Sequence, residues 1–390
     1  MNLHEYQAKE FLKAYGVPVP PGIVAATDSE AADAAATLGG SSWVVKAQVH
    51  AGGRGRAGGV KLVKSSTAAG EAAGAMLGTR LVTAQTGAQG KEVKRVYIEQ
   101  ACDVAREIYL AAMIDRSLGR VSFLASSEGG ENIEETAQAN PDNIHKLVVD
   151  PNVGLVPTEV QAMAEDLGLS GAPATATAKA IEAVYKAFTE SDASLIEINP
   201  LAVTDTGEVL ALDVKMVIDD NAVFRHPEFE KLWDEAEVSA DEIEARRHEL
   251  NYVHMDGNIG VMVSGAGLAL GVLDLLKAKG GDAANFMDVR PVATRDQIAA
   301  GIRMLLADTK VKALLVVAMG GGVLRCDTIA EGIAIACKET TRHIPAIVRF
   351  AGTAKELGEL ALQNQAVGVT FAHDLADAAE KAVAAVGGRG

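Results

Sequence analysis

The chain has 390 residues, 48% of them hydrophobic, which suffices for two or three globular cores at roughly 100–200 residues per domain. Lys and Arg number 36 against 52 Asp and Glu, giving a formal net charge of −16 without a long basic run, so nucleic acid and anionic membranes are not expected as partners. No segment approaches the roughly 20 apolar residues of a membrane span, and three cysteines without metal-type spacing fit a reducing compartment, so we expect the cytoplasm.

The chain opens with a predicted helix, a strand and a second helix. Residues 1–16 carry apolar side chains at helical spacing, and GIVAAT (22–27) is typical of a strand. An Ala-rich segment (29–40) then predicts a helix that Asp28 caps. Two more strands are expected next, at 42–49 and 59–65.

A glycine-rich loop, HAGGRGRAGG (50–59), joins those two strands. Its glycines, including Gly53 and Gly55, leave backbone N–H groups free to approach an anion, while Lys46 and Arg54 supply positive charge. The loop does not match the GxxxxGKS/T phosphate loop, and it connects strands instead of opening a helix. An anion cradle and a flexible turn therefore both fit it.

The next two predicted strands, 94–100 and 106–115, are separated by the short connection ACDVA (101–105). Glu99 and Glu107 lie near the two sides of this connection, where a strand edge and a carboxylate could hold an adenine and a ribose. Taken alone, each glutamate is more typical of a surface charge. Helices are then predicted at 157–169 and 174–191.

The segment 194–219 shows the clearest chemistry of the chain. Two apolar runs flank the turn formers TDTGE, which predicts a β-hairpin. Symmetric pairing around this turn puts Asn199 opposite Asp213 and Glu197 opposite Lys215. Side chains directly opposite in an antiparallel pair share a face, so we expect these four groups to converge.

An amide oxygen and a carboxylate in this arrangement suit Mg²⁺, a hard cation that usually takes one or two protein ligands and completes its shell with water and phosphate oxygens. The alternative is a solvated hairpin face. The mostly apolar flanks of the hairpin favour the metal site.

The second part of the chain alternates between strands and helices. A charge-dense stretch (224–250) interrupts the apolar rhythm, so we expect a first domain over residues 1–240 and a second over 241–390. Five near-continuous apolar strands, each followed by a helix, predict an α/β doubly wound parallel sheet, with ligands beyond the carboxyl ends of the strands. The strands are expected at 258–264, 284–289, 311–319, 344–352 and 367–373.

Several independent motifs resemble one family over nearly the whole chain. HEYQAKEFL, KAQVHAGGRGRAGGVKL, EINPLAV with ALDVKM, DGNIG, GAGLAL, KAKGGDAANFMDV and the RCD helix start are similar to the β subunit of ADP-forming succinate–CoA ligases (succinyl-CoA synthetases), also seen in malate–CoA ligases. The resemblance implies an ATP-grasp domain followed by a flavodoxin-like CoA-ligase domain. It also implies an α subunit that carries the phosphorylated histidine and most of the CoA site, in a heterodimer or heterotetramer.

The resemblance further implies roles for single residues. Lys46 and Gly53-Arg54-Gly55 would hold the phosphates of ATP or ADP, and Glu99, the backbone at Cys102, and Glu107 would hold the base and ribose. Asn199 and Asp213 would ligate Mg²⁺, and Glu197 would face the histidine of the α subunit.

The departures from the family pattern gather where a small organic acid would bind. Members usually have Asn in place of Ser264, a Gly-Gly-Gly stretch in place of Arg290-Pro291-Val292, and a loop one residue shorter before RCD. We expect Ser264 and Gly321, Gly322 and Val323 to contact the acid. Because proline and valine cannot replace glycines of positive φ without moving the loop, the acid could differ from succinate, with Arg290 as a new anion contact or as a solvent-exposed side chain.

The sequence is also compatible with other functions. A paralogue could act on malate or on another hydroxy or sulfonated acid. A stand-alone ATP-grasp carboxylate ligase would share the first domain but would not need the second, and a noncatalytic subunit would not need the metal pair.

Overall fold

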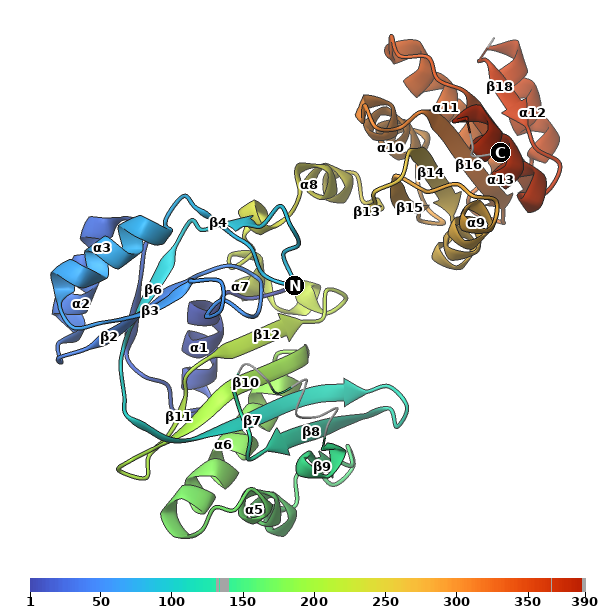
Figure 1. The fold of residues 1–390 in the computed structure, drawn as a ribbon. Helices are drawn as coiled ribbons and strands as arrows, with labels where there is room; N and C mark the ends of the chain where they lie inside the picture. Colours follow the sequence, from blue (N-terminus) through green and yellow to red (C-terminus); the bar gives the residue numbers. More distant parts are fainter. Residues whose placement is uncertain (131–132, 134–139, 366, 388–390) are drawn as a thin grey trace. The chain divides into compact units, whose positions relative to one another are not determined.

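The computed structural model describes residues 1–390 except 131–132, 134–139, 366 and 388–390. The chain divides into two compact units, Met1–Glu237 and Val238–Gly390, and each is described by itself below (Figure 1). Among the described residues, no helix is long and apolar enough to cross a membrane.

A four-stranded antiparallel sheet forms the first part of unit 1. Its order is β1-β6-β2-β3, and the faces of two Ala-rich helices pack on one side of it. Its elements are β1 (Gly22–Ala25), α2 (Asp28–Leu38), β2 (Trp43–Ala47), β3 (Val60–Val63), α3 (Ser66–Met76) and β6 (Val96–Gln100), beside the short pair β4 (Arg80–Leu81) and β5 (Lys91–Glu92).

One detail of this sheet corrects the sequence prediction. The cap of α2 is Thr27, whose hydroxyl accepts a hydrogen bond from the Glu30 amide at 3.1 Å. Asp28 is instead the first helical residue, and its carboxylate accepts a hydrogen bond from the adjacent Ser29 amide. The predicted Asp28 cap was therefore wrong by one position.

A six-stranded sheet forms the second part of unit 1. The order is β11-β10-β7-β8-β9, and β12 also pairs with β10. Helices α5 (Pro157–Asp166) and α6 (Gly171–Glu190) contribute to the same hydrophobic core. The strands are β7 (Val104–Asp115), β8 (Arg120–Ser126), β9 (His145–Val148), β10 (Ala193–Thr204), β11 (Val209–Ala211) and β12 (Val214–Ile218), with short helices at η1 (Pro141–Asn143), η2 (Val223–Arg225), α7 (Pro227–Glu230) and η3 (Glu235–Glu237).

Helix α1 (Glu5–Ala14) lies between the two sheets of unit 1 (Figure 1). Its buried side includes Leu12, which joins the core of the six-stranded sheet. The same side carries Glu5 and Lys9, which are also buried. The helix thus presents charged side chains to the interior of the unit, a placement that requires partners.

Unit 2 contains a six-stranded sheet of order β13-β15-β14-β16-β17-β18. Its last five strands are parallel, which confirms the predicted doubly wound sheet, and their order corresponds to 2-1-3-4-5 as in flavodoxin-like folds. The elements are α8 (Ala240–Arg247), β13 (Asn251–His254), β14 (Ile259–Ser264), α9 (Ala266–Ala278), β15 (Asn285–Val289), α10 (Arg295–Ala307), β16 (Ala313–Gly320), α11 (Cys326–Glu339), β17 (Ala346–Gly352), α12 (Lys355–Asn364), β18 (Val369–Phe371) and α13 (Leu375–Ala385).

The edge strand β13 was not predicted. It pairs antiparallel with β15, and its side chains are mostly exposed. An exposed edge strand lacks the apolar run by which the other strands were recognised.

Candidate functional site

Lys46 and Glu99 lie on the face of the four-stranded sheet that points away from α2 and α3. Lys46 is on β2 and Glu99 on the neighbouring strand β6, and both are buried. The Lys46 ammonium donates to one carboxylate oxygen of Glu99 at 2.7 Å and to the backbone carbonyl of Leu212 at 2.5 Å. Two of the predicted nucleotide-binding side chains are therefore in direct contact.

Arg54 connects the glycine-rich loop to the hairpin. Its guanidinium donates to the carbonyl of Ala47 at 2.8 Å and to the carboxylate of Asp213 at 2.7 Å. Gly53 precedes it with φ +70°, a backbone conformation that favours glycine. A Cβ at Gly53 would meet nothing within 4 Å, so the backbone there is open to approach.

Two buried residues of α1 complete this cluster, and sequence reasoning missed both. Glu5 contacts the Lys46 ammonium at 2.9 Å and the Arg54 guanidinium at 2.7 Å. The ammonium of Lys9 contacts Glu5 at 2.9 Å and also donates to Glu99. The signal was present in the sequence, because Glu5 and Lys9 are four residues apart and lie on the same side of the helix as the core residue Leu12.

The charges in this cluster balance. Burial opposes the charged form of each group, yet the ammonium of Lys46, followed by Lys9 and Arg54, holds the pKa of Glu5 well below its usual value. The carboxylates of Glu5 and Glu99 likewise raise the pKa of Lys46 against the effect of burial. Lys46 and Glu5 therefore remain charged in the interior of unit 1 at neutral pH.

The hairpin has the predicted register. Glu197 pairs with Lys215, and the backbone amide of Asn199 donates to the carbonyl of Asp213 at 3.0 Å. Directly opposed positions place their side chains on one face of the sheet. The Asp213 side chain is 45% exposed, in contrast to the buried cations beside it.

Asn199 is held by a second glycine segment, Gly129-Gly130, for which the sequence predicted no role. Its side-chain oxygen accepts from the Gly130 amide at 2.6 Å, and its amide nitrogen donates to the Gly130 carbonyl at 3.1 Å. The preceding residue, Gly129, donates its amide to the carbonyl of Glu107 at 3.1 Å. Glu107 and Asn199 are thus joined to the same turn.

Cys102 lies in the connection between β6 and β7, as the sequence predicts. Its side chain is half-buried, and burial, with the nearby Glu99 carboxylate, raises the pKa of its thiol. A neutral thiol leaves the backbone of this connection as its main hydrogen-bonding group.

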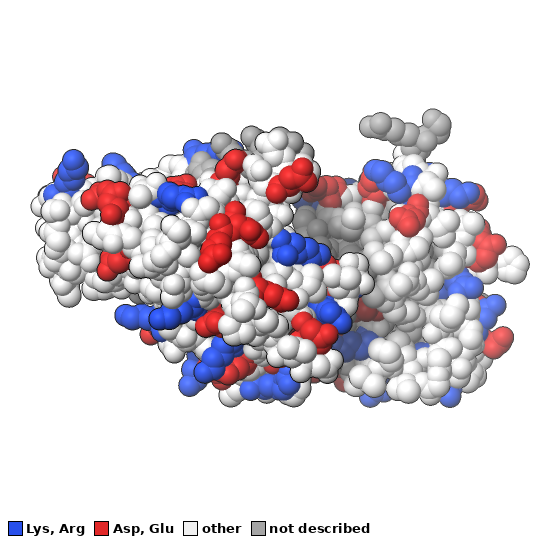
Figure 2. Space-filling view, turned by 90° about the horizontal axis from the view of Figure 1, so that it is seen from below, with Lys and Arg blue, Asp and Glu red and all other residues white. Residues whose placement is uncertain are grey.

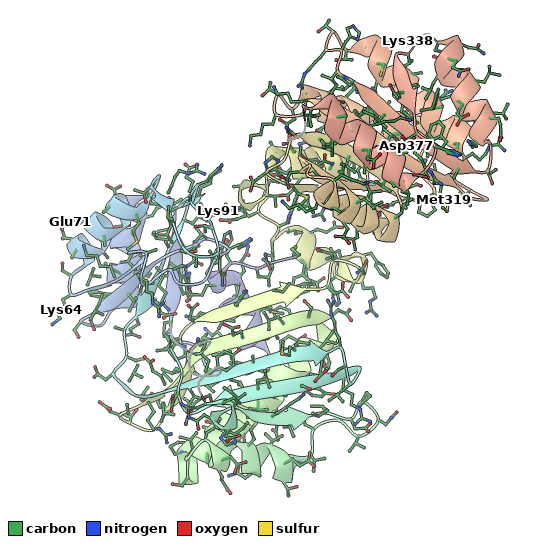
Figure 3. The ribbon with its side chains drawn as sticks, turned by 45° about the vertical axis from the view of Figure 1, so that its right-hand side comes forward. Lys64, Glu71, Lys91, Met319, Lys338 and Asp377 are labelled. Atoms are coloured by element: carbon green, nitrogen blue, oxygen red, sulfur yellow. The ribbon has the colours of Figure 1, made fainter. Side chains whose placement is uncertain are left out.

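In unit 2, Ser264 lies at the point where the strand order of the parallel sheet reverses. Its hydroxyl, at the end of β14, accepts a hydrogen bond from the Met319 amide near the end of β16 at 2.8 Å. Met319 is 55% exposed and is labelled in Figure 3. Such a reversal point, at the carboxyl ends of the strands, is where doubly wound sheets bind ligands.

Gly321, Gly322 and Val323 follow β16 directly, at the same edge of the sheet. The two glycines have open space where a Cβ would stand, and Val323 is 66% exposed. The Gly321 amide closes the turn on the carbonyl of Leu324 at 2.8 Å. All four predicted acid-contacting residues therefore belong to the ends of two adjacent strands.

Arg290 follows β15 at this edge and is exposed. Its guanidinium is 3.8 Å from the carboxylate of Glu249, a weak surface pair. The amide of Ala293 donates to the Arg290 carbonyl at 3.0 Å, so residues 290–293 form a turn without positive φ.

Lys and Arg side chains are interspersed with Asp and Glu on the face of the molecule shown in Figure 2. The net negative charge of the chain is thus not gathered into a single field on that face.

Models of two protein families match the chain. The ATP-grasp domain matches residues 2–203, and the CoA-ligase matches residues 262–385. These matches, with the fold and the buried charge cluster, define a protein of the acyl-CoA ligase class that combines an ATP-grasp unit with a CoA-ligase unit.

Curated relatives narrow this class. The succinate–CoA ligase [ADP-forming] β subunit of Acidiphilium cryptum is 48% identical over 395 residues, covering 99% of each chain. The same subunit of Acidithiobacillus ferrooxidans is 47% identical over 388 residues, and that of Bdellovibrio bacteriovorus 46%, each covering 100% of both chains. The chain belongs to the family of succinate–CoA ligase (ADP-forming) β subunits, a family of acid–thiol ligases.

A solved structure shares the fold at low sequence identity. ATP citrate lyase from Methanothrix soehngenii, in complex with citrate and coenzyme A, has a TM-score of 0.79 at 17% identity and covers 98% of this chain and 99% of that chain.

Proposed function

We propose that the chain is the β subunit of an ADP-forming acid–CoA ligase that binds ATP with Mg²⁺ and supports phosphoryl transfer to a histidine of an α subunit. An acyl phosphate and then an acyl-CoA would form from a small dicarboxylic acid such as succinate. The observation that carries the proposal is the joining of Lys46, Arg54, Glu99 and Asp213 in one cluster, in a chain that matches β subunits along its full length.

The nucleotide would occupy unit 1. Lys46 and Arg54 supply cations, and the backbone at Gly53 is open to approach. This suits phosphoryl transfer, because that reaction needs positioning and charge neutralisation, and we assign the phosphates to Lys46 and Gly53-Arg54-Gly55. Glu99, the backbone at Cys102, and Glu107 would contact the base and ribose. We assign this role to residues 1–240 and the CoA-ligase role to residues 241–390, and a cytoplasmic location remains a prediction.

The donor set of the hairpin fits Mg²⁺. Asn199 offers an amide oxygen and Asp213 a carboxylate from directly paired positions. Among the described residues, no group of three or more His, Cys, Asp or Glu side chains is placed to hold a metal ion. Magnesium, with one or two protein ligands, would neutralise phosphate charge there.

This chain would position the partners of the transfer and would not itself become phosphorylated. Glu197 lies two residues before Asn199 on the same face of β10, half-buried beside β7 and β12. From there its carboxylate would orient the imidazole of the α subunit as phosphoryl acceptor. The coenzyme would be bound mainly by that subunit.

The acid would bind at the carboxyl edge of the sheet in unit 2. Ser264 and the segment Gly321-Gly322-Val323 come from the two strands that flank the reversal point. A second candidate substrate is a different acid, such as malate or another hydroxy or sulfonated acid. This alternative is favoured by the exposed Arg290, which stands where members usually have a glycine and makes a weak surface pair with Glu249.

The test is to co-express the chain with an α subunit and to incubate the complex with labelled ATP and Mg²⁺. We expect the label on the α subunit to be lost in acid and kept in base, as phosphohistidine is. We expect no acid-stable label of the phosphoserine type. Absence of that phosphohistidine would contradict the proposed function. Ligation rates across succinate, malate and a sulfonated acid then identify the substrate, and a clear preference for succinate would end the alternative.

A further inference from the structure

Glu5 is a buried carboxylate in unit 1 to which the proposed function gives no role. It lies in the first turn of α1 and is 5% exposed. One of its oxygens accepts from the ammonium groups of Lys46 and Lys9, each at 2.9 Å. The other accepts from the guanidinium of Arg54 at 2.7 Å. A single side chain thus contacts both cations proposed to hold the nucleotide phosphates.

These two cations come from different elements. Lys46 is fixed to a strand, whereas Arg54 is part of the glycine-rich loop, whose backbone resists displacement less. Both are positively charged and both are buried, so they repel each other in an environment of low dielectric constant. The Glu5 carboxylate contacts both cations, so it offsets their repulsion and fixes their positions relative to each other.

The charge balance shows what removal of Glu5 would do. The cluster contains three cations, Lys9, Lys46 and Arg54, and three carboxylates, Glu5, Glu99 and Asp213. Without the Glu5 charge, three cations would face two carboxylates, one of them partly exposed. Arg54 would then be left with Asp213 as its carboxylate partner, the residue proposed to bind the metal.

We propose that Glu5 is a positioning residue for the nucleotide site: it holds the ammonium of Lys46 and the guanidinium of Arg54 in the arrangement that receives the phosphates. It acts through these cations and does not touch the nucleotide. This inference rests on the proposed function, since it concerns the same site.

The test compares Glu5→Gln with Glu10→Gln in the complex with an α subunit. Glu10 is exposed on the same helix, which makes it a matched control. Binding of ADP with Mg²⁺ is measured by calorimetry. We expect Glu5→Gln to raise the dissociation constant for ADP at least tenfold. KM for ATP should rise in parallel, and kcat should change by less than threefold. In Glu10→Gln all three quantities should stay within twofold of wild type. Equal or tighter binding by Glu5→Gln would overturn the proposal.

A double-mutant cycle separates positioning from a general loss of structure. Arg54→Gln is made alone and together with Glu5→Gln. If Glu5 acts through Arg54, its substitution weakens ADP binding at least threefold less in the Arg54→Gln background than in wild type. Additive effects of the two substitutions would show that Glu5 supports only the fold, and would overturn the proposal.

A conservative variant covers the case in which Glu5→Gln does not assemble. Glu5→Asp keeps the cluster neutral but is one methylene shorter, so it cannot reach both cations at once. We expect it to assemble and to bind ADP several-fold more weakly than wild type, whereas wild-type binding would count against positioning. Failure of the wild-type complex to bind ADP at all would instead refute the proposed function, which keeps the two outcomes distinct.

Discussion

The guanidinium of Arg54 and the carboxylate of Asp213 form a 2.7 Å ion pair between residues that are 159 positions apart in the chain. The pair joins the glycine-rich loop to the hairpin within unit 1. In this pair, the side chain proposed to hold phosphate, Arg54, is bonded to the side chain proposed to hold the metal, Asp213. The proposed roles of the two residues therefore predict that the pair opens when the nucleotide binds.

Asp213→Asn should separate the ligand role of this carboxylate from its structural role. We expect binding of ADP with Mg²⁺ to weaken at least tenfold, about 1.4 kcal/mol. The free energy of unfolding should change by less than about 1 kcal/mol, because the Asp213 carboxylate is partly exposed and the buried Arg54 keeps its bonds to Glu5 and to the Ala47 carbonyl. Calorimetry and urea unfolding measure the two quantities. Asp205→Asn, in the exposed turn of the same hairpin, is the control and should leave both unchanged.

Gly129→Ala should displace the turn that holds Asn199. A Cβ at this position would lie 2.8 Å from the backbone carbon of Ile108, and strand β7 cannot yield. We expect a loss of about 1–3 kcal/mol in unfolding free energy and weaker ADP binding. Gly271→Ala, at a half-buried position of α9 where an added Cβ meets nothing within 4 Å, is the control. It should be neutral or slightly stabilising, and equal effects of both changes would contradict the prediction.

His50 should make the stability of unit 1 depend on pH. Its ring packs against that of His4, with centroids 4.3 Å apart, and its Nε2 is buried without a hydrogen-bond partner among the described residues. Burial, followed by the charge of His4, lowers the pKa of His50 to about 3. Unfolding releases this restraint, so the unfolded state binds more protons below the usual histidine pKa of about 6.5.

The contribution of His50 is therefore complete above about pH 6.5 and is lost as the pH falls from 6.5 towards 3. Between pH 6.5 and 4.5 we expect a loss of about 1–2 kcal/mol in wild type, since the group is partly accessible to solvent. Burial opposes the charged form of the neighbouring Asp234, but its contacts with His4 and Arg95 lower its pKa to about 2. The stability that Asp234 contributes is therefore lost at more acidic pH than that of His50. Urea unfolding across this range should show a smaller pH slope for His50→Leu. The exposed His343→Gln should keep the wild-type slope.

Ser264→Ala should affect the acid and spare the nucleotide. The substitution removes the acceptor for the exposed Met319 amide, which water can replace, so stability should change by less than about 1 kcal/mol. We expect KM for the acid to rise at least threefold and ADP binding in unit 1 to stay the same. Thr370→Ala, which removes an exposed hydroxyl from β18, is the control. A rise in KM shared by both variants would show that Ser264 has no special role.

Features that depend on local pattern could be predicted from the sequence. The hairpin register follows from apolar runs placed symmetrically about one turn, and the pairing of Glu197 with Lys215 confirms it. The parallel sheet follows from near-continuous apolar strands separated by helices, and it is also confirmed. Motifs spread along the chain then identified the family, which the curated relatives confirm.

Contacts between distant segments could not be predicted. Periodicity assigned the opening helix by its apolar side, but it could not show that Glu5 and Lys9 meet residues of β2, β6 and the glycine-rich loop. The bonds of Asn199 to Gly130 depend on a turn with no regular pattern. The Thr27 cap and the edge strand β13 were missed because their signals are weak and local.

The carbonyl oxygen of Leu212 accepts from the ammonium groups of both Lys9 and Lys46, each at 2.5 Å. This acceptor belongs to the main chain, so every amino acid that could stand at position 212 would present it equally. Point mutation at that codon cannot remove the attachment of the hairpin to the two lysines. An amide-to-ester replacement in the backbone, which weakens the carbonyl as an acceptor without altering any side chain, would be needed to loosen it.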